Sequence, residues 1–270
     1  MMSTTLQGFD KSPDGTAFSS KGPANARALV LIHGFGLSRH IWAPFVEELG
    51  KDHHVITYDL YGHGDSEALP GEASLSLFAE QLRTLMDHCG IEKADIIGFS
   101  IGGMINRRFA MDYPERCRSL TILNSPHDRG VEGQKRVEDR ARKVQEGGKM
   151  ATLPSALERW FTPQFREENP DVMDLISIWR ENTDDVSYAG TAWVLAHGVR
   201  ELISPSPALQ IPSLVITCEN DSGSTPQMTR QIAEEIDEAE TRIIPELQHL
   251  GLMESPQLFI GPIQSFLERT

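Results

Sequence analysis

Short apolar runs alternate along this chain with segments in which apolar residues recur every three or four positions. A continuous run such as residues 28–32 is typical of a strand buried on both faces, whereas the spacing of Leu75, Phe78 and Leu82 is typical of an amphipathic helix. We expect strands at residues 28–32, 54–59, 95–99, 119–124, 213–217 and 241–244. We expect helices after Ser38 and at residues 75–89, 104–109, 225–239 and 256–267. The Asp14-Gly15 turn predicts an early hairpin whose arm includes residues 16–18.

Strands that alternate with helices predict an α/β fold with a mostly parallel central sheet flanked by helices. The alternation stops after Asn124, because residues 128–206 contain helical patterns and no strand-like run. The first of these patterns, at residues 132–146, is highly charged. We therefore expect a division into an α/β core, residues 1–127 and 207–270, and a helical cap, residues 128–206, inserted above the sheet.

Composition narrows the class of protein. The chain has 270 residues, of which 39% are hydrophobic and 24% charged, as in ordinary soluble globular proteins. Its net charge of −14 disfavours nucleic acid as a partner. Three scattered cysteines suit a reducing compartment, and the polar residues 1–10 predict no signal peptide. We expect a cytoplasmic monomer or homodimer without a metal, cofactor or membrane partner.

A sharp turn at Ser100 carries the strongest chemical signal. Gly98, Ser100 and Gly102 fit the pattern Gly-x-Ser-x-Gly, between an apolar run and a predicted helix. A strand that turns at once into a helix strains its corner residue and crowds the positions two residues away, which favours glycine there. Such a nucleophile elbow presents the serine hydroxyl above the sheet, at the positive end of the helix.

Two partners for this serine follow later strands in the order that the elbow requires. Asp221 comes after the predicted strand 213–217, and His249 comes after strand 241–244. A histidine base would take the serine proton, and a buried carboxylate would orient the imidazole. This predicts a catalytic triad of Ser100, His249 and Asp221. Glu219 and Asp128 remain alternatives for the carboxylate.

Other residues are candidates for binding. The small residues around Gly34 let backbone N–H groups approach a ligand, so Phe35 and Ile101 are the expected oxyanion-hole donors. Around the predicted cap, we expect substrate contacts from Trp160, Trp193, His127 and His197. Arg159 and Arg200 are candidates to meet a carboxylate. His33 and His63 are expected to shape their turns.

The elbow, the segment 33–36, the segment 59–66 and the late Asp221 and His249 resemble the α/β-hydrolase superfamily. Residues 98–105, 113–116 and 158–166 resemble more narrowly the branch of 3-oxoadipate enol-lactonases and related carboxylesterases. Residues 193–201 are more similar to general cap-bearing hydrolases. The resemblance implies a cofactor-independent serine hydrolase.

The expected activity is cleavage of a carboxylic ester or lactone of a small organic acid through an acyl-enzyme. A C–C bond hydrolase or perhydrolase with the same triad is an alternative. A third is a ligand receptor on a hydrolase scaffold. Epoxide hydrolases and haloalkane dehalogenases are disfavoured, because they need a carboxylate at the position of Ser100.

Overall fold

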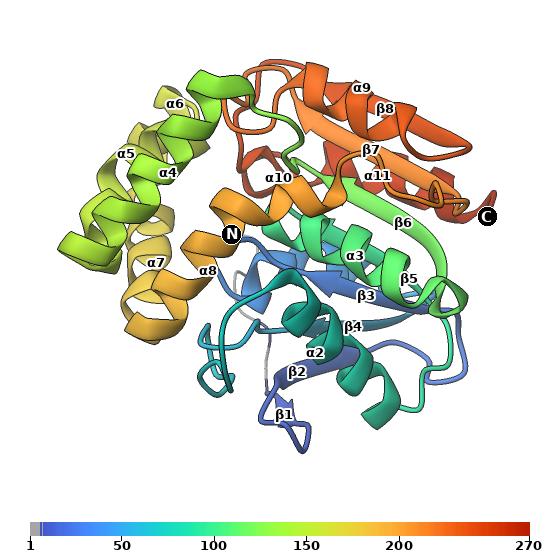
Figure 1. Ribbon diagram of the computed structural model, residues 1–270. Helices are drawn as coiled ribbons and strands as arrows, with labels where there is room; N and C mark the ends of the chain where they lie inside the picture. The colour runs from blue at the N-terminus through green and yellow to red at the C-terminus, as the bar shows by residue number, and fades with distance from the viewer. Residues whose placement is uncertain (1–5, 7) are drawn as a thin grey trace.

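A single sheet of eight strands organises the described part of the chain, which is residue 6 and residues 8–270 of a computed structural model (Figure 1). Most of the polar N-terminal stretch, which predicts no signal peptide, lies outside the described residues. The strands are β1 (Asp10–Lys11), β2 (Ala17–Lys21), β3 (Ala28–Ile32), β4 (His54–Tyr58), β5 (Ala94–Phe99), β6 (Cys117–Leu123), β7 (Ser213–Cys218) and β8 (Ala239–Ile244).

The strand order across the sheet is β1-β2-β4-β3-β5-β6-β7-β8. β1 pairs with β2, and β2 with β4, in antiparallel fashion, whereas every later pair is parallel. The predicted early hairpin and the mostly parallel α/β sheet are therefore confirmed. Because parallel strands end at the same edge, the loops after β3, β5, β6, β7 and β8 gather on one side of the molecule.

The alternation of side chains along β3 explains why both faces of the sheet are covered. Leu29 and Leu31 join one hydrophobic cluster, while Val30 and Ile32 join another. Burying each such side chain contributes about 1.5–3 kcal/mol. The helices of the first layer are α1 (Ala43–Leu49) and α11 (Gln257–Leu267), and those of the second are α2 (Leu75–His88), α3 (Ile101–Asp112) and α9 (Pro226–Glu234).

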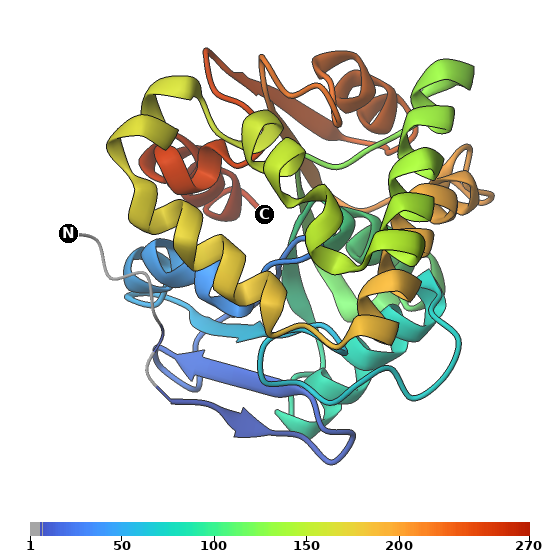
Figure 2. The same ribbon diagram turned by 90° about the vertical axis from the view of Figure 1, so that its left-hand side faces the viewer.

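Helices alone connect β6 to β7, as the sequence predicts. They are α4 (Gly130–Gly147), α5 (Leu153–Trp160), α6 (Pro163–Glu168), α7 (Pro170–Glu181) and α8 (Asp185–His197), with η3 (Lys149–Thr152) and η4 (Gly198–Leu202). Figure 2 shows them from the side of the molecule on which they gather. α4 packs on α8 through Val137, Ala141 and Ala192. The remaining helices are η1 (Arg39–Trp42), η2 (Pro114–Arg116) and α10 (Gly251–Glu254).

The helix predicted at residues 225–239 is too long. α9 ends at Glu234, and Ile236 forms an isolated bridge with Leu209. Glu238 has a φ of 60°, which turns the chain into β8 two residues before the predicted strand start. The tertiary pairing with a distant segment overrides the local helical pattern. None of the helices in the described chain combines the length and the apolar character that a membrane crossing requires.

Candidate active site

The Ser100 turn is as tight as its glycines predict. Ser100 lies between β5 and α3 with a φ of 57° and a ψ of −113°. A Cβ atom on Gly98 would lie 2.1 Å from the carbonyl oxygen of Gly102, and one on Gly102 would lie 2.4 Å from the carbonyl oxygen of Ile32. These positions therefore exclude any side chain, and the backbone of the turn is held in a conformation that an L-residue rarely adopts.

This strain gives a stability prediction. Replacing Ser100 with glycine relieves the positive φ, whereas alanine keeps the Cβ atom and the strain. We expect Ser100→Gly to have a free energy of unfolding about 1 kcal/mol higher than Ser100→Ala. Urea unfolding of both variants measures the difference. Equal stabilities, or a less stable glycine variant, would show that the turn stores no strain.

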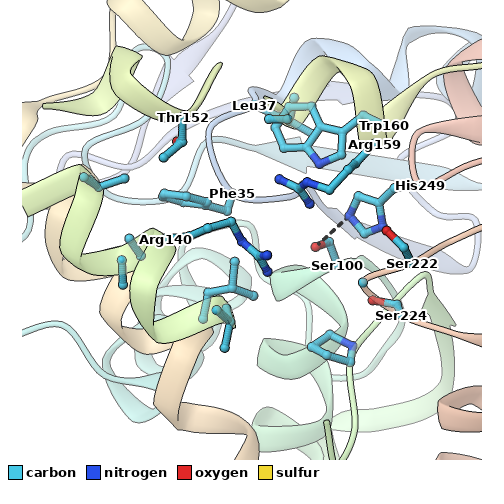
Figure 3. Close-up of a pocket in the computed structure, with 18 of the residues that line it drawn as sticks. Phe35, Leu37, Ser100, Arg140, Thr152, Arg159, Trp160, Ser222, Ser224 and His249 are labelled. Carbon is cyan, nitrogen blue, oxygen red and sulfur yellow. Dashed lines mark hydrogen bonds between the residues drawn. The ribbon is translucent and has the colours of Figure 1, made fainter. Parts of the chain in front are cut away.

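Ser100, His249 and Asp221 form one chain of hydrogen bonds. The Nε2 atom of His249 lies 3.1 Å from Ser100 Oγ (Figure 3). Its Nδ1 atom lies 2.6 Å from Asp221 Oδ2. A carboxylate only accepts hydrogen bonds, so Nδ1 is the donor to Asp221. Nε2 of the neutral ring is then free to accept the hydroxyl proton of Ser100. Three side chains from the ends of three strands thus converge.

The carboxylate of Asp221 is buried, and protein groups donate hydrogen bonds to both of its oxygens. Besides His249, it accepts hydrogen bonds from the Asn124 side chain at 2.9 Å and from the backbone N–H groups of Gly223 and Ser224 at 2.8 and 2.9 Å. Burial by itself raises the pKa of Asp221, but the adjacent His249 and these hydrogen bonds bring the net pKa below its usual value. Asp221 is therefore ionised at neutral pH.

The two alternative carboxylates are engaged elsewhere. Glu219 is exposed, and its side chain accepts a hydrogen bond from the backbone of Glu246 at 3.0 Å. Asp128 is also exposed and accepts from the backbone of Gly130 at 2.9 Å. The structure therefore brings Asp221, and neither alternative, to His249.

The loop after β3 presents the candidate oxyanion donors. Within the described residues, the backbone N–H groups of Phe35 and Ile101 donate to no acceptor, whereas that of Gly36 donates to His63 Nε2 at 3.2 Å. Ile101 is the first residue of α3, so its N–H points away from the helix. One free N–H group belongs to Ile101, which directly follows Ser100. The other belongs to Phe35, in the loop after β3.

Two buried histidines hold this loop. His63 accepts from Gly36 and donates through Nδ1 to a carbonyl in its own turn, while His33 accepts from the Leu60 N–H at 3.0 Å and donates to the Gly34 carbonyl at 2.7 Å. Burial lowers the pKa of His33 to about 4 and that of His63 to about 3. Both are therefore neutral, and both shape their turns as the sequence predicts.

These buried histidines predict a loss of stability in acid. In the unfolded chain an imidazole takes up a proton near pH 6.5, but in the folded protein His33 and His63 do so only near pH 4 and 3. Their contribution is complete above pH 6.5 and is lost as the pH falls to about 4 for His33 and about 3 for His63. Each adds up to about 1.4 kcal/mol per pH unit in this window. We expect urea unfolding of His63→Asn to show a shallower pH slope than wild type; an unchanged slope would contradict the assignment.

A pocket opens in front of Ser100, with an empty volume of about 890 Å³ that includes its solvent-exposed part. Phe35 and Trp160 line it, together with Ser100, Asp221 and His249. Trp160 also lies against the His249 ring, with 6.3 Å between the ring centroids. Of the cap residues predicted to contact substrate, Trp160 is thus at the pocket.

Four other predicted binding residues lie elsewhere. Trp193 is 44% exposed and stacks on His197, which faces Glu138 rather than the pocket. His127 is buried, with Nε2 3.1 Å from a Glu235 carboxylate oxygen. Gly34 lies under the pocket wall, where a Cβ atom would lie 2.8 Å from the Phe99 ring. Period and composition did not indicate which face of a cap helix turns inward.

The sequence interpretation also missed part of the lining. Arg129, Arg140 and Arg180 line the pocket beside Arg159, whereas Arg200 is 65% exposed at the side chain and faces Glu138 at 3.6 Å. No local pattern separates these inward arginines from the many exposed charges nearby. Within residues 6 and 8–270, no cluster of His, Cys, Asp or Glu side chains is suited to hold a metal ion.

With this fold and site in place, the chain belongs to the α/β hydrolase fold family, whose model matches residues 27–256. It is similar to 3-oxoadipate enol-lactonase 2 of Acinetobacter baylyi, at 27% identity over 93% of this chain and 92% of the relative. It is also similar to (E)-2-((N-methylformamido)methylene)succinate hydrolase of the same organism, at 27% identity over 90% of each chain.

Solved structures show the same likeness. The enol-lactonase from Burkholderia xenovorans LB400 superimposes with a TM-score of 0.85 at 27% identity, covering 97% of this chain and 100% of that one. An esterase from Thermogutta terrifontis gives a TM-score of 0.80 at 26% identity, covering 98% and 99%. The resemblance to the enol-lactonase and esterase branch is thereby confirmed, and the chain is a member of a hydrolase family.

Proposed function

We propose that this protein is a serine hydrolase that cleaves a carboxylic ester or lactone of a small organic acid. The observation that carries the proposal is the chain of hydrogen bonds from Ser100 through His249 to the buried Asp221, at the floor of a pocket. The similarity to enol-lactonases and an esterase supports the same bond class. Neither step of the reaction requires a cofactor.

Each group has one role in the proposed first half-reaction. Ser100 Oγ attacks the substrate carbonyl while His249 Nε2 takes its proton, and the ionised Asp221 stabilises the resulting imidazolium. The backbone N–H groups of Phe35 and Ile101 hold the tetrahedral oxyanion. Losing one such donor typically costs about 10²–10³ in rate. His249 then returns the proton to the departing oxygen, leaving an acyl group on Ser100.

Water completes the cycle. His249 removes a proton from a water molecule that attacks the acyl carbonyl, and the same oxyanion donors stabilise the second tetrahedral intermediate. This intermediate collapses as the bond to Ser100 Oγ breaks and His249 returns the proton to that oxygen, which releases the acid and restores the enzyme. We propose that residues 128–206, which contain the helices from α4 to α8, form a cap. This cap shields the acyl-enzyme from bulk solvent and selects the substrate. The extent of this cap as a domain stays a prediction.

The test combines labelling with turnover. A fluorophosphonate probe followed by peptide mass spectrometry should modify Ser100, and p-nitrophenyl acetate should be hydrolysed with steady turnover beyond one equivalent. Labelling without turnover of any ester or lactone would favour a receptor on a hydrolase scaffold. Turnover of a vinylogous diketone or of hydrogen peroxide with a carboxylic acid, but of no ester, would assign the same triad to another bond.

A further inference from the structure

Four arginines from different elements of the helical segment line the Ser100 pocket. Arg129 precedes α4, Arg140 lies on α4, Arg159 on α5 and Arg180 on α7. The guanidinium groups of Arg140 and Arg159 point into the space that Ser100 and His249 border (Figure 3). One pocket wall is therefore built from cations that lie far apart in the sequence, in a chain whose net charge is −14.

These arginines lack acidic partners. Within the described residues, no Asp or Glu oxygen lies within 4.0 Å of a side-chain nitrogen of any of the four. Arg39 shows the ordinary arrangement, since this buried side chain is paired with both Asp59 and Asp65. Arg180 is buried and the other three are half-buried, and such charges are costly when unpaired, so a group of them at one pocket calls for a ligand.

Arg180 is the clearest case. It is 1% exposed, and neither its Nε nor its Nη1 atom has a hydrogen-bond partner among the described residues. Its guanidinium carbon lies 5.1 Å from the centroid of the Trp160 ring and 5.6 Å from that of Tyr188. The two aromatic rings hold the planar cation in place but satisfy none of its N–H donors.

The four side chains also repel one another. Burial lowers the pKa of Arg140 to about 10, with neighbouring Arg159 and Arg136 adding to the effect, and lowers that of Arg129 to about 10, with Arg140 adding. Burial lowers the pKa of Arg159 and Arg180 as well. Arg129 and Arg140 nevertheless remain protonated at neutral pH, and Asp221 is the one carboxylate in the described pocket lining, so the pocket carries a net positive charge.

We propose that the pocket binds a small organic acid with at least two free carboxylates, so that the substrate is an ester or lactone of a polycarboxylic acid. The inference rests on the proposed hydrolase function for the reaction, but not for the binding. A single carboxylate has two oxygens. Two guanidinium groups, each donating two N–H groups to that carboxylate, fill the acceptor positions of both oxygens. Four arginines therefore match two carboxylates rather than one.

The rest of the lining favours carboxylates on a carbon skeleton over free phosphate. Apolar side chains line the pocket together with the cations, among them Leu37, Val137, Val144 and Leu195. Such a surface suits the methylene or ring carbons between two carboxylates. Arg129 and Arg140 also line a neighbouring pocket with Arg136, so the cationic surface continues outward and can attract anions toward Ser100.

The first experiment compares ligands that differ in charge. Butyrate, succinate, tricarballylate and inorganic phosphate are tested by isothermal titration calorimetry and as inhibitors of p-nitrophenyl acetate hydrolysis. We expect succinate and tricarballylate to bind at least about tenfold more tightly than butyrate and phosphate, and to raise the melting temperature. Tightest binding of phosphate would assign the site to a phosphate ester instead and overturn the carboxylate proposal.

The second experiment removes the cations one at a time. Arg140→Gln and Arg159→Gln are compared with Arg142→Gln, an exposed α4 residue that is paired with Asp139 and lies outside the pocket. We expect succinate to bind about ten- to a hundredfold more weakly to the first two variants and unchanged to the third. Without ligand, the melting temperatures of the first two should equal or exceed that of wild type, because an unpaired charge is removed.

The two proposals can fail separately. Rapid hydrolysis of neutral esters with no binding of dicarboxylates would overturn the polycarboxylate inference and leave the hydrolase intact. Binding of succinate that depends on Arg140 and Arg159, with no hydrolysis of any ester or lactone, would preserve the binding site and overturn the proposed reaction. A fall in ligand-free melting temperature with unchanged succinate affinity would show that these arginines serve the fold.

Discussion

Ser100→Ala is expected to lower kcat/KM for the best ester or lactone substrate by at least about 10⁴-fold. The hydroxyl oxygen is the atom that forms the covalent bond, and no other side chain accepts a hydrogen bond from, or donates one to, His249 Nε2 within the described residues. Alanine keeps the Cβ atom at the strained corner, so the pocket and the two free N–H groups persist. Steady-state kinetics with p-nitrophenyl acetate and a lactone panel measure the loss.

The control for this variant is Ser265→Ala, on the exposed side of α11. It should retain wild-type rates. A second check is the double variant Ser100→Ala with His249→Ala, which should be no slower than Ser100→Ala alone, because the two residues act as one unit. Retention of more than a tenth of the activity by Ser100→Ala would remove Ser100 from the proposed mechanism.

Asp221→Asn is expected to lower kcat by about 10³–10⁴-fold with little change in KM. The amide can donate a hydrogen bond to His249 Nδ1 and so stabilise the tautomer whose Nε2 carries the proton. That nitrogen then cannot accept the proton of Ser100. The Asn oxygen still accepts from the backbone of Gly223 and Ser224, so the loop should keep its conformation.

Glu219→Gln is the matched control for this variant, since it removes a carboxylate two residues away that is exposed and bonded to the Glu246 backbone. We expect its kcat to stay within about threefold of wild type. The steady-state kcat of both variants, with far-UV circular dichroism to verify folding, decides between the two carboxylates. Equal losses in the two variants would mean that the orientation of His249 does not depend on Asp221.

Particular patterns explain how much of the fold the sequence predicts. The run at residues 28–32 coincides with β3, because a strand buried on both faces needs an unbroken apolar sequence. The helix at Leu75–His88 follows from its apolar spacing and from Ser74, whose side chain caps the N-terminus. The end of α9 was not predictable in this way, since Ile236 leaves the helical pattern to pair with Leu209, far away in the sequence.

The candidate site divides along the same line. Ser100 could be chosen from the sequence because the turn requires glycine at positions 98 and 102. A side chain there would collide with backbone atoms of the turn itself or of the neighbouring strand. Trp193 could not be excluded, because α8 carries apolar residues nearly all round and its sequence shows no single inward face. Arg140 and Arg180 were indistinguishable from solvated charges until α4 and α7 were placed beside Ser100.

By itself, the sequence determined the succession of strands and helices along the chain, the sharp turn at Ser100 and the order in which its two partners follow. These features depend on steric rules and periodicities that act over a few residues. Only the tertiary structure decided which carboxylate reaches His249, which aromatic residues line the pocket, and that four arginines share it without acidic partners. Those features depend on distances between elements, and such distances are set by how whole faces pack rather than by any local pattern.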